Sequence, residues 1–222
     1  MRKFRGKNRA YTVLLVFLLL CNFLAVFTFT VNPVEAITSS VSTSETGLAT
    51  AYNNQRKLVR LSDGTLYVVY LKKFNGYYQI FVAKSTDDGE TWTGETRIST
   101  YTGMDSNDQY HPSIAVDSND NLHVVWYGRA TGYSYNQIWY AKYDGSSWST
   151  PVRISTYTGM DSKSQYVPSI AVDSNDNLHV VWRGATTNYS YSQVWYANYT
   201  SSWSTPVRIS TYDGMDSNYQ YK

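Results

Sequence analysis

The sequence predicts an all-β protein that contains three tandem copies of a four-stranded unit. The first observation is a repeat with a period of about 56 residues. The segment PSIAVDSNDNLHVVW begins at Pro112 and again at Pro168. The segment RISTYTGMDS begins at Arg97 and Arg153 and returns with one change at Arg208. The second observation is that short runs of aromatic and β-branched residues alternate with Asn, Asp and Gly, as in arrays of strands.

A looser first copy precedes the two closely matching ones. Its segment LVRLSDGTLYVVY, from Leu58, aligns with SIAVDSNDNLHVVW from Ser113. Its segment QIFVAKSTDDGETW, from Gln79, aligns with QIWYAKYDGSSW from Gln137 and QVWYANYTSSW from Gln193. The repeat therefore extends over most of the chain.

Each copy is expected to form four strands. In the second copy these are Ser113–Val116, Leu122–Trp126, Gln137–Tyr143 and Val152–Thr156. Residues 117–121 and the pair Asp144 and Gly145 form turns, because Asn, Asp and Gly tolerate left-handed backbone geometry. A polar loop that contains Gly128 and Gly132 joins the second strand to the third.

The second strand, LHVVW, is apolar on both of its faces. Leu122, Val124 and Trp126 fall on one face, and His123 and Val125 fall on the other. A sheet with one face in water does not need this pattern, but a sheet between two neighbouring sheets does. We therefore predict a β-propeller in which three four-stranded blades are present. The expected blades cover about 57–100, 112–156 and 168–211.

The turn after the third strand of the first copy carries a family motif. Residues 85–92 read Ser-x-Asp-x-Gly-x-Thr-Trp, which resembles the Asp-box, or BNR repeat, of sialidases. The resemblance implies a sialidase-like β-propeller and a structural role for the box residues. The later copies are degenerate, and the third is one residue shorter. The expected box residues are Ser85, Asp87, Gly89, Thr91 and Trp92, with Asp144, Gly145 and Trp148 in the second copy and Trp203 in the third.

Three blades are fewer than the four that known propellers require. Residues 219–222 align with residues 108–111, which precede the first strand of the second copy. One hypothesis is that the chain is part of a propeller of six or more blades. The alternative is self-association, in which several copies together close the propeller.

The N-terminus resembles an export signal. Residues 1–9 are basic, Thr12–Val31 is almost wholly apolar, and Asn32–Ala36 is a plausible cleavage site. An uncleaved membrane anchor is the alternative, since the apolar run is long enough to span a bilayer. We expect 1–36 to be a signal peptide or anchor, 37–48 a Ser/Thr-rich linker and 49–222 the repeats, placed outside the cytoplasm. Without the first 36 residues the chain has 14 basic and 16 acidic residues, which gives no electrostatic footprint for nucleic acid.

Ligand-binding residues are expected where the loops between blades meet the loops between second and third strands. Tyrosine rings stack on apolar sugar faces, and charged groups bond hydroxyls or carboxylates. Arg183, Tyr189 and Tyr191 are taken as counterparts of Arg129, Tyr133 and Tyr135. The other interpretation is that the tyrosines pack between blades and the aspartates cap turns. The candidates are Arg129, Tyr133, Tyr135, Arg183, Tyr189, Tyr191, Tyr101, Asp105, Tyr157 and Asp161.

Catalytic residues are not predicted. The sialidases that the motif resembles use an arginine triad, a Tyr–Glu nucleophile pair and an Asp acid/base, yet no Glu stands in the second or third copy. Near-identical blades also offer the same groups repeatedly, whereas catalysis needs one asymmetric set. No cofactor or metal is expected, because the three histidines have no metal-ligand spacing. The predicted function is extracellular recognition of glycans or cell-surface polymers. The alternatives are a fragment of a sialidase-like exo-glycosidase and a structural surface-layer repeat.

Overall fold

The computed structural model describes residues 11–16, 26–31 and 56–217. The chain divides into two units, Met1–Thr38 and Ser39–Lys222. In the first unit, β1 (Tyr11–Val16) pairs antiparallel with β2 (Val26–Val31). The rest of the expected signal or anchor, the 37–48 linker and the terminal residues 218–222 lie outside the described residues. Within the described ranges, no helix has the length and apolar character needed to cross a membrane.

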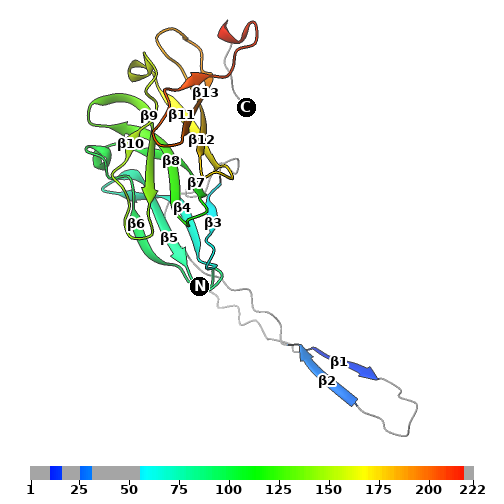
Figure 1. The fold of residues 1–222 in the computed structure, drawn as a ribbon. Coiled ribbons are helices and arrows are strands. Elements are labelled where there is room, and N and C mark those ends of the chain that lie inside the picture. Colours follow the sequence, from blue (N-terminus) through cyan, green and yellow to red (C-terminus); the bar gives the residue numbers. More distant parts are fainter. Residues whose placement is uncertain (1–10, 17–25, 32–55, 218–222) are drawn as a thin grey trace, which may run out of the picture. The chain divides into compact units, whose positions relative to one another are not determined.

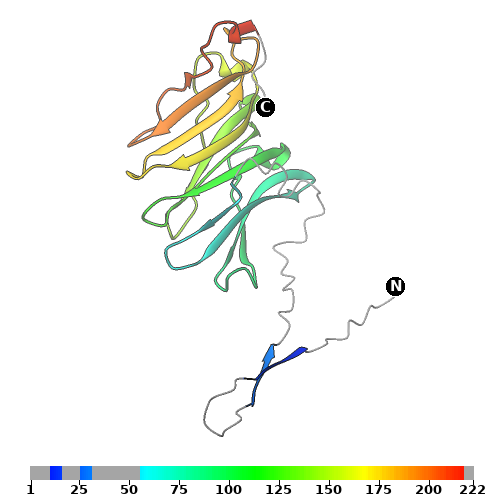
Figure 2. The ribbon, with the colours of Figure 1, turned by 90° about the vertical axis from the view of Figure 1, so that its right-hand side faces the viewer.

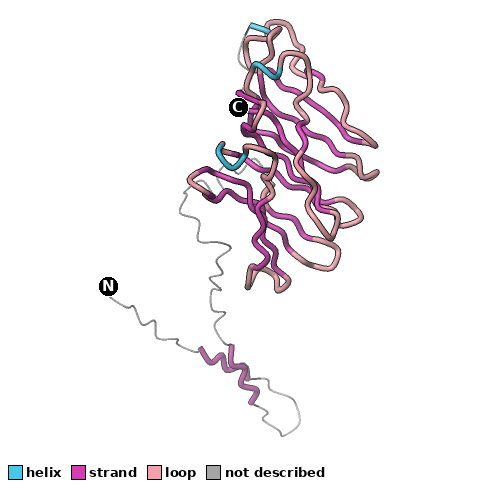
Figure 3. Tube along the Cα trace, turned by 90° about the vertical axis from the view of Figure 1, so that its left-hand side faces the viewer, coloured by secondary structure: helices cyan, strands magenta, loops and turns pink. Residues whose placement is uncertain are grey.

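The second unit contains three four-stranded antiparallel sheets, one for each repeat (Figure 1). Figure 2 shows the sheets following one another in chain order as successive blades. Among the described residues 56–217, helix is confined to the short turns η1 (Met104–Ser106), η2 (Met160–Ser162) and η3 (Met215–Ser217) (Figure 3). The predicted all-β architecture of three four-stranded blades is confirmed. The strands are β3 (Leu58–Arg60), β4 (Leu66–Phe74), β5 (Tyr77–Ser85) and β6 (Thr93–Arg97) in blade 1; β7 (Gln109–Val116), β8 (Leu122–Ala130), β9 (Tyr133–Tyr143) and β10 (Val152–Arg153) in blade 2; and β11 (Gln165–Val172), β12 (Leu178–Gly184), β13 (Gln193–Tyr199) and β14 (Val207–Arg208) in blade 3.

The strand bounds differ from the predicted ones at one end of each blade. In blade 2, β8 and β9 run through most of the predicted polar loop and leave only Thr131 and Gly132 as the turn. Gly132 has φ 86°, which allows the chain to reverse in two residues and lets the ladder continue. The fourth strand, in contrast, is shorter than predicted, because Val152 and Arg153 alone pair with β9.

Both faces of the middle blade are buried, as the LHVVW pattern predicts. Trp126 on one face of β8 packs in a cluster with Leu71 of blade 1. Val125 on the other face packs in a second cluster with Val180 of blade 3. Each fully buried side chain of this size contributes about 1.5–3 kcal/mol. The seams between the blades therefore provide the core.

A β-bulge interrupts the first strand of blades 2 and 3. The pairing register shifts between Tyr110 and Ser113 in β7, and the same shift recurs in β11. His111 and Val167, inside the two bulges, have φ values of 49° and 55°. Such left-handed geometry is rare for a β-branched residue, so the surrounding ladder imposes it on Val167.

Candidate functional site at the loop end of the blades

The two predicted loop families do meet at one end of the blades, called the loop end here. The backbone N–H of Thr131, in the β8–β9 turn, donates to the carbonyl of Thr102, in the loop from blade 1 to blade 2. A Cβ atom on Gly103 would lie 2.2 Å from Oγ1 of Thr131, so glycine permits this approach. A Cβ atom on Gly159 would lie equally close to Thr187 in the next seam. The arrangement is therefore a property of the repeat.

Buried glutamines hold the loops between the blades. Gln137 has no exposed surface, and its Nε2 donates to the carbonyl of Met160 at 3.0 Å. Its Oε1 accepts from the Ser155 hydroxyl at 2.8 Å. Gln79 and Gln193 make the same two kinds of contact in their own blades. The sequence analysis missed these residues, although a glutamine at the same position in each copy was a visible signal.

An arginine in each blade joins a carboxylate to an aromatic ring at the loop end. Arg153 pairs with Asp161, and its Cζ lies 4.7 Å from the ring centre of Tyr133. In the other blades the same roles fall to Arg97, Asp105 and Phe74, and to Arg208, Asp216 and Tyr189. The predicted ligand residues Asp105 and Asp161 therefore hold arginines of their own chain. These arginines were not predicted to lie at this end of the blades.

Four candidate tyrosines pack on buried indoles. The rings of Tyr101 and Tyr133 lie 4.8 and 5.4 Å from the ring of Trp139. Tyr157 and Tyr189 lie 4.9 and 6.0 Å from Trp195 in the same way. These contacts agree with the other interpretation given above, in which the tyrosines pack between the blades and do not bind a ligand.

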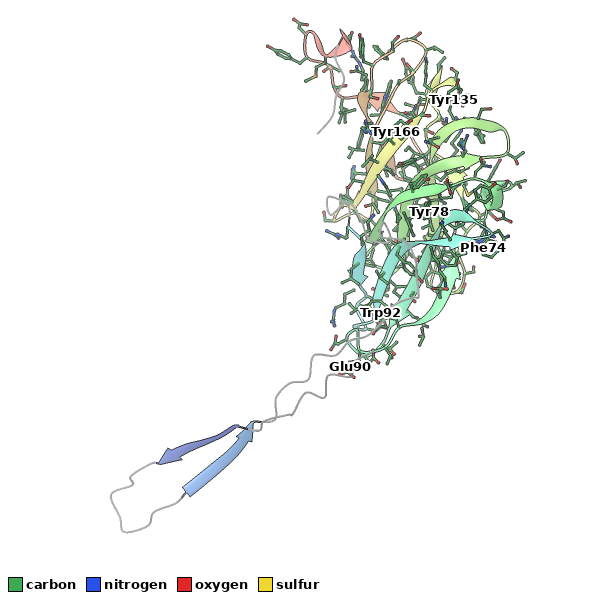
Figure 4. The ribbon with its side chains drawn as sticks, turned by 180° about the vertical axis from the view of Figure 1, so that it is seen from behind. Phe74, Tyr78, Glu90, Trp92, Tyr135 and Tyr166 are labelled. Atoms are coloured by element: carbon green, nitrogen blue, oxygen red, sulfur yellow. The ribbon has the colours of Figure 1, made fainter. Side chains whose placement is uncertain are left out.

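Arg183 does not occupy the position assigned to it from the sequence. It pairs across the ladder with Tyr166, as Tyr127 pairs with Tyr110. Arg183 is therefore the counterpart of Tyr127, and the predicted equivalence with Arg129 is wrong. The repeat itself places Arg183 opposite Tyr127, because the two residues directly follow the matching Trp182 and Trp126. Cζ of Arg183 lies 5.2 Å from the ring centre of Tyr166. Tyr166 is labelled in Figure 4.

Besides Asp105 and Asp161, which pair with arginines, three candidates are exposed at the loop end. Tyr135 lies on β9 and is labelled in Figure 4, Tyr191 precedes β13, and Arg129 is near the end of β8. Two phenol rings and a guanidinium can stack on the apolar face of a sugar and donate to its oxygens.

Two titratable side chains near the loop end, Tyr110 and His111, have pKa values far from 7. Burial, followed by the hydrogen bond to Asp108, raises the pKa of Tyr110 to about 12. Burial, with Lys57 and Arg183 adding to the effect, lowers the pKa of His111 to about 4. Neither group has the pKa near 7 that suits general acid–base catalysis at neutral pH. In the part of the chain that the structure describes, no three His, Cys, Asp or Glu side chains are grouped to hold a metal ion.

The turn at residues 85–92, whose sequence resembles the Asp-box, lies at the other end of blade 1. Asp87 accepts from the hydroxyl of Ser85 at 2.7 Å and from the backbone N–H of Thr91 at 2.8 Å. Gly89 has φ 92°, and its N–H donates to Ser85 Oγ at 2.8 Å. Trp92 packs against a buried cluster of blade 1. Figure 4 shows Glu90 and Trp92 together at this end, away from Phe74.

Comparison with known proteins supports the fold. No protein-family model and no curated protein matches the chain. Among solved structures, it aligns with Hadza microbial sialidase Hz136 at 18% identity and a TM-score of 0.53, over 67% of this chain and 36% of that one. It aligns with an ulvan lyase of polysaccharide lyase family PL25 at 12% identity and a TM-score of 0.54. That alignment covers 70% of this chain and 43% of the lyase. It aligns with an α-L-arabinanase from Penicillium chrysogenum at 18% identity and a TM-score of 0.51. That alignment covers 71% of this chain and 49% of the arabinanase.

These comparisons define the class of fold. Identities of this size show a shared fold and no more. The three sheets and these neighbours together are consistent with blades of a β-propeller. The chain spans between 36% and 49% of the length of the three proteins.

Proposed function

We propose that this protein is a secreted or cell-surface propeller of the BNR/Asp-box type that recognises glycans at its loop end. The observation that carries the proposal is the pair of exposed tyrosines, Tyr135 and Tyr191, at the same end of successive blades. Arg129 is also exposed at this end, on β8. Aromatic rings with few rotatable bonds provide contact area for sugars at low entropic cost. The basic and apolar N-terminal segment would deliver or anchor the blades outside the cytoplasm.

Two further observations support a glycan as the ligand class. The solved proteins of similar fold include a sialidase, an ulvan lyase and an arabinanase, which are named for glycan substrates. The motif at residues 85–92 resembles the structural box of sialidases. Hydrogen bonds among Ser85, Asp87, Gly89 and Thr91 close its turn. Successive blades offer similar groups at this end, and catalysis needs one asymmetric set. We therefore propose that the protein binds glycans without cleaving them.

The test is a glycan array probed with the full chain and with the double variant Tyr135→Ala/Tyr191→Ala. Loss of one stacked ring costs about 1–1.5 kcal/mol, so the double variant should bind its glycan at least tenfold more weakly. Glu90→Ala, at the opposite end of blade 1, is the control and should bind like the parent. Unchanged binding by the double variant would reject the loop-end assignment.

The alternative is a portion of a sialidase-like exo-glycosidase, for which the fold of the Hadza sialidase is the specific observation. Glycosidases need a pair of carboxyl groups free to act on the scissile bond. Asp105 and Asp161 at the loop end are instead paired with arginines. The full chain is therefore expected not to release the fluorophore from a 4-methylumbelliferyl sialoside. Turnover that disappears with a single tyrosine substitution would favour the enzyme.

A further inference from the structure

A cavity of about 550 Å³ lies between blades 2 and 3, near the turns at the end opposite the loop end. This volume is within the range of small-molecule sites in proteins. The wall is formed by three aromatic residues, Tyr140, Tyr199 and Trp203, together with polar residues from both blades. None of these residues belongs to the loop-end surface. We call this cavity and its equivalent in the preceding seam the seam pockets.

The aromatic wall is held in place by its own packing. Trp203 stands edge-on to Tyr140 at a centroid distance of 5.0 Å and an angle of 73°. It meets Tyr199 at 5.5 Å and 61°. The Tyr140 hydroxyl contacts Nδ1 of His123 at 2.8 Å, and burial raises the pKa of Tyr140, so the phenol stays neutral. A preformed aromatic wall binds a flat apolar face without an ordering cost.

The carboxylates beside the pocket already have partners. Asp117 accepts from the side chain of Asn121 at 2.8 Å and contacts Nε2 of His123 at 3.1 Å. Asp176 accepts from the backbone N–H of Ser118 at 2.8 Å and from its hydroxyl. Asp176 therefore joins the β11–β12 turn of blade 3 to the β7–β8 turn of blade 2. The negative charge of the two carboxylates would nevertheless oppose an anionic ligand nearby.

Two donors at the pocket have no acceptor among the described residues. The indole N–H of Trp203 is buried and makes no hydrogen bond there. The ammonium group of Lys142 makes no hydrogen bond or ion pair in the same part of the chain, although its backbone N–H donates to Ser149 Oγ at 3.0 Å. A buried donor without an acceptor costs about 1–3 kcal/mol. A ligand with neutral oxygen acceptors would remove this cost.

The seam between blades 1 and 2 repeats the arrangement. It holds a cavity of about 420 Å³ whose lining includes Trp148, Tyr143 and Lys84. Tyr143 lies 5.4 Å from Trp148, as Tyr199 lies near Trp203. Lys84 pairs across the ladder with Tyr67 in blade 1, as Lys142 pairs with His123 in blade 2. The pocket is therefore built by the repeat, with a lysine from one blade and a tryptophan and tyrosine from the next.

We propose that the seam pockets each bind one uncharged sugar residue of a glycan chain. The aromatic wall takes the apolar ring face, and Lys142 and Trp203 donate to ring or hydroxyl oxygens. At the pocket between blades 2 and 3, Asp117 and Asp176 favour a neutral sugar over a uronate or sialate. Two pockets on one chain would bind a polymer with avidity beyond that of one site. The inference shares its ligand class with the proposed function but uses different residues at the other end of the blades.

The test measures binding of the full chain to neutral hexasaccharides of arabinose, xylose, mannose and glucose, and to hexagalacturonic acid, by titration calorimetry. The variants are Lys142→Ala and Trp203→Phe, which keeps the ring and removes the N–H. Each removes a hydrogen bond to the sugar, so affinity for the neutral ligand should fall about tenfold. Lys163→Ala removes the same charge away from the pocket and should leave affinity unchanged. Thermal unfolding of each variant confirms that it is folded.

The loop-end variant Tyr135→Ala/Tyr191→Ala separates the two proposals. Weakening by the seam variants alone supports the seam pockets and rejects the loop-end site. Weakening by the loop-end variant alone overturns the present inference and leaves the proposed function standing. Preference for hexagalacturonic acid, or absence of binding to every neutral hexasaccharide, also overturns it.

Discussion

At the scale of single residues, burial between the blades keeps ionisable groups in their neutral forms. His111 lies in the bulge of β7, and burial lowers its pKa to about 4. Burial is also the largest cause that lowers the pKa of His123. Each imidazole is neutral in the folded chain at pH values where it would be protonated in the unfolded chain. This difference links stability to pH.

The first prediction follows from His111. Between about pH 6.5 and pH 4 the unfolded chain binds a proton at this position and the folded chain does not, so the free energy of unfolding falls as the pH is lowered. His111→Asn should flatten this dependence, and Asn tolerates the left-handed backbone at this position. Urea unfolding at a series of pH values measures it. A parent chain whose stability stays constant from pH 6.5 to 4.5 would contradict the assignment.

The carboxylates act in a different pH range. Hydrogen bonds within the turns lower the pKa values of Asp87 and Asp144 to about 2. Their stabilising contribution is present above the ordinary carboxyl pKa of about 4 and is lost only as the pH falls further. Between pH 6.5 and pH 4.5, the change in the free energy of unfolding therefore reports on the histidines and not on these carboxylates.

The second prediction concerns Gln137. Gln137→Leu keeps the approximate size of the side chain but leaves the Ser155 hydroxyl and the Met160 carbonyl without this partner. We expect a loss of about 2–3 kcal/mol in the free energy of unfolding, because buried polar groups are left unsatisfied. Ser147→Ala, at an exposed turn, is the control and should change stability by less than about 0.5 kcal/mol. A similarly small effect of Gln137→Leu would show that the loop is held by other contacts.

At the scale of elements, the contact between a blade-to-blade loop and the next hairpin sets the loop end. Gly103 and Gly132 both have left-handed φ values, 81° and 86°. A Cβ on Gly103 would meet the Thr131 backbone nitrogen at 2.7 Å, whereas a Cβ on Gly132 has no atom within 4 Å. Comparing alanine variants of the two glycines therefore distinguishes two contributions to stability. One is the strain of a left-handed backbone, and the other is the clash of an added Cβ with Thr131.

The third prediction compares these glycines. Gly132→Ala should cost about 1 kcal/mol, from the backbone conformation alone. Gly103→Ala should cost at least about 1 kcal/mol more, since the loop and the hairpin must move apart. Chemical denaturation of the two variants measures the difference. Equal costs would mean that the loop shifts freely and does not position the loop end.

Element bounds show where sequence reasoning stops. The first and second strands of blade 2 were each predicted to be four residues shorter at the loop end than β7 and β8 are. The sequence there contains Gly128 and Arg129, which read as loop residues. In the structure Gly128 is needed because the Gln109 side chain lies against it, with its Oε1 only 2.2 Å from where a Cβ would be. Tertiary packing, and not local propensity, makes this segment a strand.

At the scale of the whole molecule, the outer face of blade 3 differs from the corresponding buried faces. Val181 is 39% exposed, whereas its counterpart Val125 is fully buried. Ile209 is 50% exposed, whereas Ile154 is 1% exposed. Tyr212 is 79% exposed, although Tyr157 at the same position packs on Trp195. Side chains that fill a seam elsewhere therefore face solvent here.

The fourth prediction is that copies of the chain self-associate through this face of blade 3, which continues the geometry of the established seams. Ile209→Asp with Tyr212→Ser should reduce association, because a charge and a hydroxyl replace apolar contact area. Sedimentation velocity from low to high micromolar concentration measures it. Val152→Asp, an exposed change in blade 2, is the control. A parent chain that remains monomeric over this range would contradict the prediction.

The repeat could be predicted from the sequence, as could the number of strands per blade and the burial of both faces, because these features follow from the spacing of apolar and turn-forming residues. The turn at residues 85–92 could also be located, since its hydrogen bonds join residues at most a few positions apart. The sequence did not reveal which loop-end residues already have partners within the chain. Asp105 pairs with Arg97, Tyr133 packs on Trp139 and Arg183 contacts Tyr166. These partnerships depend on how strands and loops meet in space, which local spacing does not encode.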